Sequence, residues 1–156
     1  WPCTGTEHPG TPCLHMDQFT CGLGVLHSIE YVPPAELPDE KYPLYLTTGR
    51  VLYQFHTGTM TMKSEGLNEL APESFVEMSS HDSETYQIQE GARLRFSSRS
   101  GEIEARAKIS EKGVKGTIFL PFHYAMAAAN KLTNAALDPT AKIPEFKVCA
   151  VRIEKF

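Results

Sequence analysis

The sequence lacks a strong excess of charge, a long apolar segment and a basic region. It has 15 Lys and Arg against 19 Asp and Glu, and the basic residues are scattered, so no basic stripe is available to neutralise nucleic-acid phosphates. No apolar run approaches the roughly 20 residues that span a bilayer. The chain also begins without the basic and apolar regions of a signal peptide. We therefore expect no nucleic-acid partner, no transmembrane segment and a cytoplasmic location.

Familiar cysteine patterns and catalytic motifs are also missing. The four cysteines match neither a CxxC knuckle nor a small disulfide scaffold, which favours free cytosolic thiols. A zinc site is the alternative, because soft ligands gather near the start of the chain, at Cys3, His8, Cys13, His15 and Cys21. The sequence contains no nucleophile elbow, Walker loop, HExxH motif or iron-sulfur cysteine run. It therefore predicts binding groups, without catalytic residues or metal ligands of its own.

The pattern of short strands predicts a mainly β domain. At 156 residues and 41% hydrophobic content, the chain fits one domain with a core. Residues 1–43 are rich in Pro and Gly and lack periodicity, which indicates an extended N-terminal arm before a domain at 44–156; the absence of an initial Met indicates a fragment. Strands are expected at 44–48, 75–78, 93–96, 102–109, 117–120 and 148–154. Short helices are expected within 67–73, 80–87 and 124–131. Many short strands with few helices favour a closed barrel.

Two segments after the first expected strand offer groups for an anionic or flat ligand. Gly49 lets backbone approach such a ligand, and Arg50 can fork onto phosphate or carbonyl oxygens. The following segment 56–61 combines hydroxyls and backbone amides in the way of a phosphate- or pterin-binding loop. An ordinary turn and a polar surface loop are the alternatives.

Three further positions suit a guanine or a pterin. The Asp82 carboxylate can accept two hydrogen bonds from the N1 and N2 edge of guanine, although its spacing from Ser79 also makes it a helix-capping residue. Phe122, His123 and Asn130 would suit stacking on a pterin and recognition of its edge. A purely structural histidine is the alternative.

Several motifs, in their order and spacing, resemble the C-terminal part of formate dehydrogenase catalytic (alpha) subunits, which belong to the molybdopterin oxidoreductases. The resemblance covers essentially the whole chain. The motifs are Trp1-Pro2-Cys3, His8-Pro9-Gly10-Thr11, Pro33-Pro34-Ala35-Glu36, Tyr42-Pro43-Leu44, Thr48-Gly49-Arg50, Ser98-Arg99-Ser100-Gly101, Asn130-Lys131-Leu132-Thr133 and Pro144-Glu145-Phe146-Lys147-Val148-Cys149-Ala150-Val151.

The resemblance implies a six-stranded double-psi β-barrel with a few short helices. This barrel would help hold a bis(molybdopterin guanine dinucleotide) with molybdenum or tungsten, for two-electron interconversion of formate and CO2. The implied cofactor-binding residues are Thr48, Gly49, Arg50, His56, Thr57, Thr59, Asp82, His123, Asn130, Thr133 and Lys147. Around Asp82 the sequence departs from the pattern of related domains, which often have Asn and Ala where it has Ser79 and Ser83.

In this family the metal ligand and the iron-sulfur motif lie upstream, outside this sequence. The implied partners are the upstream domains of the same subunit and iron-sulfur or other electron-transfer subunits, and the isolated domain is expected to be inactive. Two other interpretations remain open. One is a stand-alone barrel subunit, such as that of formylmethanofuran dehydrogenase, and the other is a protein-interaction barrel without a cofactor.

Overall fold

The structure is a computed structural model that describes Cys3 and residues 5–156. Trp1 and Pro2, which begin the first motif above, lie outside the described residues, as does Thr4. Contacts divide the chain into two units, Trp1–Val32 and Pro33–Phe156. Residues 33–43 therefore pack with the second unit, and the division at residue 43 and the extended arm stay predictions. The described part of the first unit has no helix or strand, only an isolated bridge between Phe19 and Gly22.

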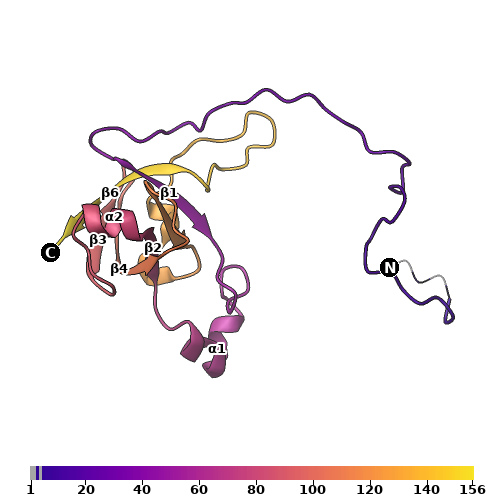
Figure 1. Cartoon of the computed structure of the whole chain (residues 1–156), viewed down its shortest axis with the longest axis horizontal. Coiled ribbons are helices and arrows are strands. Elements are labelled where there is room, and N and C mark those ends of the chain that lie inside the picture. Colours follow the sequence, from indigo (N-terminus) through magenta and orange to yellow (C-terminus); the bar gives the residue numbers. More distant parts are fainter. Residues whose placement is uncertain (1–2, 4) are drawn as a thin grey trace. The chain divides into compact units, whose positions relative to one another are not determined.

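The second unit is a closed six-stranded barrel (Figure 1). Its elements follow one another as β1 (Leu44–Gly49), η1 (Thr61–Lys63), α1 (Glu65–Leu70), β2 (Phe75–Ser79), α2 (Ser80–Thr85), β3 (Arg93–Ser97), β4 (Glu102–Ser110), β5 (Thr117–Pro121), η2 (Ala125–Ala127), η3 (Ala129–Lys131) and β6 (Cys149–Lys155). The six expected strands are confirmed to within about two residues at each end.

The strand order has an internal two-fold symmetry. Around the barrel the order is β1-β5-β2-β4-β3-β6. Suppose that each strand is replaced by the strand three places later in the chain, with the count returning to β1 after β6. The parallel pair β1·β5 then becomes the parallel pair β4·β2, and the antiparallel pair β1·β6 becomes the antiparallel pair β4·β3. The two halves of the chain thus interlock in the same way, which confirms the double-psi barrel that the resemblance implied.

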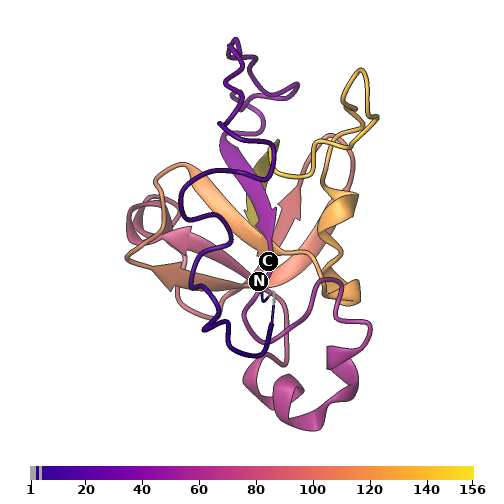
Figure 2. The ribbon, with the colours of Figure 1, turned by 90° about the vertical axis from the view of Figure 1, so that its right-hand side faces the viewer.

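Each half contains one loop that crosses the end of a strand. After β1 the chain passes over the end of β5 to reach β2, and after β4 it passes over the end of β2 to reach β5. Because β2 and β5 are antiparallel, the two crossovers, residues 50–74 and 111–116, lie at opposite ends of the barrel. Figure 2 shows the first of them, which carries α1, below the strands.

Alternation along the strands fills the core. In β1 and β4 every second residue points inward, so that one face of each strand is buried and the other is wet. The largest fully buried side chains come from five of the strands and from the end of η3: Leu46, Val76, Met78, Leu94, Phe96, Ile118, Leu120, Pro121, Leu132, Cys149 and Val151. Strand β4 adds the smaller buried side chains Ile103, Ala105 and Ala107. The barrel thus has a packed apolar interior, and polar ligands must bind at its ends or its outer surface.

The expected Ala-rich helix at 124–131 is wrong. The structure has two short 3-10 turns there, η2 and η3, separated by Ala128 in an extended conformation with φ −65° and ψ 104°. Ala127, Ala129 and Leu132 are buried against the barrel. Their packing sets the local backbone and overrides the intrinsic helix propensity of alanine.

Asp82 takes part in the cap of α2, whose N-cap residue is Ser79, and fastens the second crossover. Its backbone N–H donates to the Ser79 hydroxyl (3.1 Å), as the capping spacing predicts. Its carboxylate accepts hydrogen bonds from that hydroxyl (2.7 Å) and from the N–H of Gly116 (2.9 Å), directly before β5. Asp82 is only 4% exposed, so these bonds form away from competing water.

Replacing Asp82 by asparagine should therefore destabilise the barrel. We expect the variant to lose about 1 kcal/mol of unfolding free energy, because a neutral amide replaces a charged acceptor in two buried hydrogen bonds. Urea unfolding measures the change. Glu84→Gln is the matched control, since Glu84 is exposed on the same helix, and equal stability of the two variants would contradict the fastening role.

Candidate functional site

A cavity of about 260 Å³ lies at the first crossover, where β1 and β5 end and β6 begins. The lining comes from four separate stretches of chain: Thr48, Arg50, His56, Thr57, Phe122, Asn130, Phe146 and Lys147. Six of these belong to the set of cofactor-binding residues predicted from the sequence. The fold brings them together because the ends of the parallel strands β1 and β5 meet at one end of the barrel.

The loop before β6 is fixed to the end of β1 by two hydrogen bonds. The buried Thr48 hydroxyl donates to the backbone carbonyl of Phe146 (2.7 Å). In return, the Lys147 ammonium donates to the backbone carbonyl of Thr48 (2.6 Å). Thr48 and Lys147 thus hold the wall of the cavity as well as lining it.

Arg50 is the arginine that the structure leaves without an acidic partner. Among the described residues, ion pairs engage the other five arginines: Arg93, Arg95, Arg99, Arg106 and Arg152. Arg50 is exposed, lines the cavity and forms no such pair in the part of the chain that is described. An unpaired guanidinium beside a cavity offers a forked donor to phosphate or carbonyl oxygens.

The segment 54–62 forms a compact loop of hydroxyls with a strained entry. His56 has φ 51°, a left-handed conformation that costs free energy in a residue other than glycine. Its ring stands edge-on to Phe122, with 5.5 Å between the ring centroids. The hydroxyl oxygens of Thr57 and Thr59 are 2.9 Å apart, so Thr59 supports Thr57 from just outside the cavity. The structure thus holds the imidazole and hydroxyls predicted for a phosphate- or pterin-binding loop at the cavity rim.

Three other predicted residues closely follow cavity residues in the chain without lining the cavity themselves. Gly49 joins Thr48 to Arg50 and its carbonyl accepts a hydrogen bond from the N–H of Phe122 (3.1 Å). The buried Thr133 hydroxyl donates to the carbonyl of Asn130 (3.2 Å) and so supports η3. His123 follows the end of β5, is 5% exposed and lies against the ring of Tyr124, with centroids 3.7 Å apart.

Burial lowers the pKa of His123 below its ordinary value. Both ring nitrogens lack a hydrogen-bond partner within the described part of the chain. Because the folded pKa is depressed, the unfolded chain binds more protons as the pH falls through about 6.5, the ordinary histidine value, so acidification removes stability.

We expect His123→Gln to weaken the dependence of stability on pH. Between pH 7 and pH 5 the wild-type protein should lose more unfolding free energy than the variant, because glutamine does not titrate. Urea titrations at the two pH values measure the difference. His81→Gln is the control, since that ring is exposed; identical pH slopes for wild type and His123→Gln would contradict a buried neutral imidazole.

The structure does not bring Asp82 together with the other predicted residues. Its hydrogen bond to Gly116 places it at the start of β5, whereas the cavity lies at the end of that strand. The prediction for Asp82 considered both a cap and a guanine contact, and the geometry accounts for the cap.

Phe146 is the cavity residue that the prediction missed. Its signals in the sequence are an aromatic residue within a polar loop and its place in the motif at 144–151.

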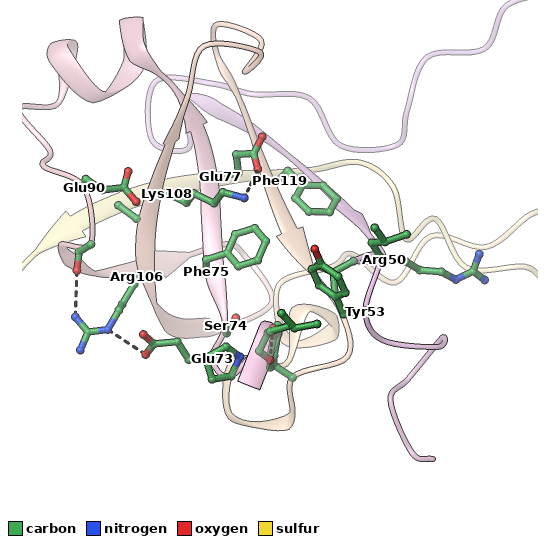
Figure 3. Close-up of a pocket in the computed structure, with 18 residues that line it drawn as sticks. Arg50, Tyr53, Glu73, Ser74, Phe75, Glu77, Glu90, Arg106, Lys108 and Phe119 are labelled. Atoms are coloured by element: carbon green, nitrogen blue, oxygen red, sulfur yellow. Dashed lines mark hydrogen bonds and ion pairs between the residues drawn. The ribbon is translucent and has the colours of Figure 1, made fainter. Parts of the chain in front are cut away.

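A separate groove of about 650 Å³ lies on the outer surface of the barrel, across β2, β4 and β5 (Figure 3). Phe75 and Phe119 line it, with Lys108 paired to Glu77 at 3.4 Å. Arg50 lines this groove as well as the cavity, although its guanidinium extends away from the groove. Most charges here are already paired, so the groove offers less to an anionic ligand than the cavity does.

Two negative findings concern only the described residues. No group of three or more His, Cys, Asp or Glu side chains there is arranged to hold a metal ion, so the structure does not gather the cysteines and histidines considered for zinc. No helix in the same part of the chain has the length and apolar character needed to cross a membrane.

Comparison with known proteins decides the family. The model of the Molydopterin dinucleotide binding domain matches residues 44–150. The chain belongs to this family. Over 157 aligned residues it is 47% identical to F420-dependent formate dehydrogenase subunit alpha from Methanocaldococcus jannaschii, covering 99% of this chain and 23% of that protein. It is also 43% identical to the assimilatory nitrate reductase catalytic subunit of Bacillus subtilis, covering 98% of this chain and 22% of that subunit.

The same fold occurs in a solved structure. Acetylene hydratase from Pelobacter acetylenicus aligns with a TM-score of 0.67 at 15% identity, over 75% of this chain and 19% of that one. The chain thus spans less than a quarter of the length of each of these proteins. A molybdopterin dinucleotide fits the residues present, because the cavity combines an arginine without an acidic partner, hydroxyls and aromatic rings.

Proposed function

We propose that this Molydopterin dinucleotide binding domain serves a formate dehydrogenase catalytic subunit, where it helps hold a bis(molybdopterin guanine dinucleotide) with molybdenum or tungsten. The observation that carries the proposal is the 47% identity to F420-dependent formate dehydrogenase subunit alpha over 99% of the chain. A nitrate reductase is the second candidate, supported by the 43% identity to the Bacillus subtilis enzyme.

The residues of the cavity would divide the work of binding. Arg50 and Lys147 supply positive charge for phosphate oxygens, and Thr57, with Thr59 behind it, supplies hydroxyl donors. Asn130 presents hydrogen-bonding groups to a pterin edge, whereas the buried His123 would support the pterin side from outside the cavity lining. When bound, the cofactor supplies the metal at which formate and CO2 interconvert by two electrons, and the protein groups position it.

Other parts of the protein would complete the site. We propose that upstream domains of the same subunit supply the metal ligand and the rest of the cofactor pocket, with residues 1–43 as an arm leading from them to the barrel at 44–156. Iron-sulfur or other electron-transfer subunits would accept the electrons, and the complex would work in the cytoplasm. The 23% coverage of the formate dehydrogenase relative, which leaves most of its length outside the similarity, supports the further domains.

Analysis of the protein purified with its cofactor tests the proposal. Acid release should yield a pterin and a guanine nucleotide, and metal analysis should find molybdenum or tungsten. Formate, and not nitrate, should then change the redox state of a dye. Absence of pterin and guanine nucleotide would favour a cofactor-free interaction barrel, and reaction with nitrate alone would favour the second candidate. The isolated barrel should reduce no dye with formate.

A further inference from the structure

We infer that Glu145 is a positioning residue for the cofactor cavity, and that it works by tying the cavity wall to a strap formed by residues 33–39. The inference rests on the proposed function for its ligand. Glu145 does not line the cavity. It precedes Phe146 and Lys147, the two residues of the loop before β6 that line the cavity.

The strap is anchored to the barrel by one arginine. Arg99, in the hairpin between β3 and β4, forks onto the carboxylates of Glu36 and Asp39. The Arg99 guanidinium also lies 4.8 Å from the centre of the Tyr42 ring. Hydrogen bonds from the backbone N–H groups of Tyr42 and Lys41, together with Arg99, lower the pKa of Asp39, so the anchor is charged at neutral pH. A bidentate arginine is a stiffer anchor than a single surface pair.

Glu145 joins this anchored strap to the loop. Its carboxylate accepts a hydrogen bond from the N–H of Ala35, at 3.1 Å from one oxygen and 3.4 Å from the other. It also accepts from the side-chain amide of Asn134 at 3.4 Å, and that amide donates to the carbonyl of Val148 as well. The Glu145 carboxylate therefore connects Ala35, which lies 110 residues away in sequence, to the loop that carries Phe146 and Lys147. Through Asn134 it is also linked to Val148, on the other side of these two residues.

The need for such a tie follows from the other bonds of the loop. Phe146 and Lys147 are held to β1 by the Thr48 hydroxyl and by the Lys147 ammonium. Both groups also line the cavity, so an entering anion competes for them. Glu145 is outside the cavity, and its hydrogen bonds persist when the Lys147 ammonium turns to a ligand. The strap thus keeps the cavity wall in place while Thr48 and Lys147 bind the ligand.

The test uses Glu145→Ala and Glu145→Gln in the full-length protein purified with its cofactor. Glu145→Ala should speed the loss of guanine nucleotide about fivefold, the factor that corresponds to one ordinary hydrogen bond. It should also speed amide hydrogen exchange at 145–149 while leaving exchange in β3 and β4 unchanged. Glutamine keeps an acceptor oxygen and should restore most of both properties. Glu40→Ala is the matched control, because Glu40 is exposed in the neighbouring turn.

A variant at the other end of the tie completes the test. Ala35→Pro removes the donating N–H, so it should resemble Glu145→Ala, and the double variant should be no worse than either single one. Additive effects, or unchanged exchange at 145–149 in Glu145→Ala, would overturn the inference. If the wild-type protein held no guanine nucleotide, the proposed function would fail, whereas the exchange data would still decide whether Glu145 fixes the loop.

Discussion

Replacing Gly113 by alanine is expected to destabilise the barrel by about 3 kcal/mol or more. A Cβ atom at this position would lie 2.6 Å from both the backbone nitrogen and the Cα of Ser79, and 2.9 Å from the backbone carbonyl carbon of Met78. Backbone atoms at the end of a buried strand cannot move aside as a flexible side chain can. Urea or thermal unfolding should therefore show a large loss, or the variant should fail to fold.

Topology explains why Gly113 lies so close to β2. Strands β2 and β4 are parallel and end together, at Ser79 and Ser110. Strand β5 lies on the far side of β2, so the chain must cross directly over the end of β2. Gly66→Ala is the control: this glycine lies in α1 with open space around it, and alanine should be neutral or stabilise the helix by up to about 1 kcal/mol. Equal stability of the Gly113 and Gly66 variants would contradict a tight crossing.

The strands could be predicted from the sequence because they carry their own signal. Alternation in 102–109 and the turn at 98–101 depend on burial of one face and on local turn geometry, and both occur in the structure. The crossing of the end of β2 has no such local signal, since it depends on which strands are neighbours in space. The double-psi topology was therefore available only through the family resemblance.

The candidate site likewise contains residues that have a local signal in the sequence and residues that have none. Arg50, His56 and Thr57 follow a strand end, where a change from apolar to polar residues is visible in the sequence. Asp82 has an equally suitable side chain, but the antiparallel pairing of β2 and β5 places it at the other end of the barrel. The roles of Glu145 and Phe146 could not be assigned from sequence, because they come from contacts with Ala35 and Thr48, about a hundred residues away.

Arg50→Ala should speed the loss of bound cofactor roughly 10- to 150-fold, since hydrogen bonds from a charged group to an anion contribute about 1.5–3 kcal/mol. The guanine nucleotide that remains bound after dilution measures this loss. Arg50→Lys should lie between alanine and wild type, because lysine keeps the charge but not the planar fork.

Arg93→Ala is the matched control for charge. Arg93 is an exposed arginine on β3 that pairs with Glu104 at 2.7 Å and does not line the cavity. The Arg93→Ala protein should retain its cofactor as the wild type does, although its net charge changes by the same amount as in Arg50→Ala. Equal retention by the Arg50 and Arg93 variants would remove Arg50 from the site. The unpaired guanidinium at the first crossover would then have to be explained by a partner other than the cofactor.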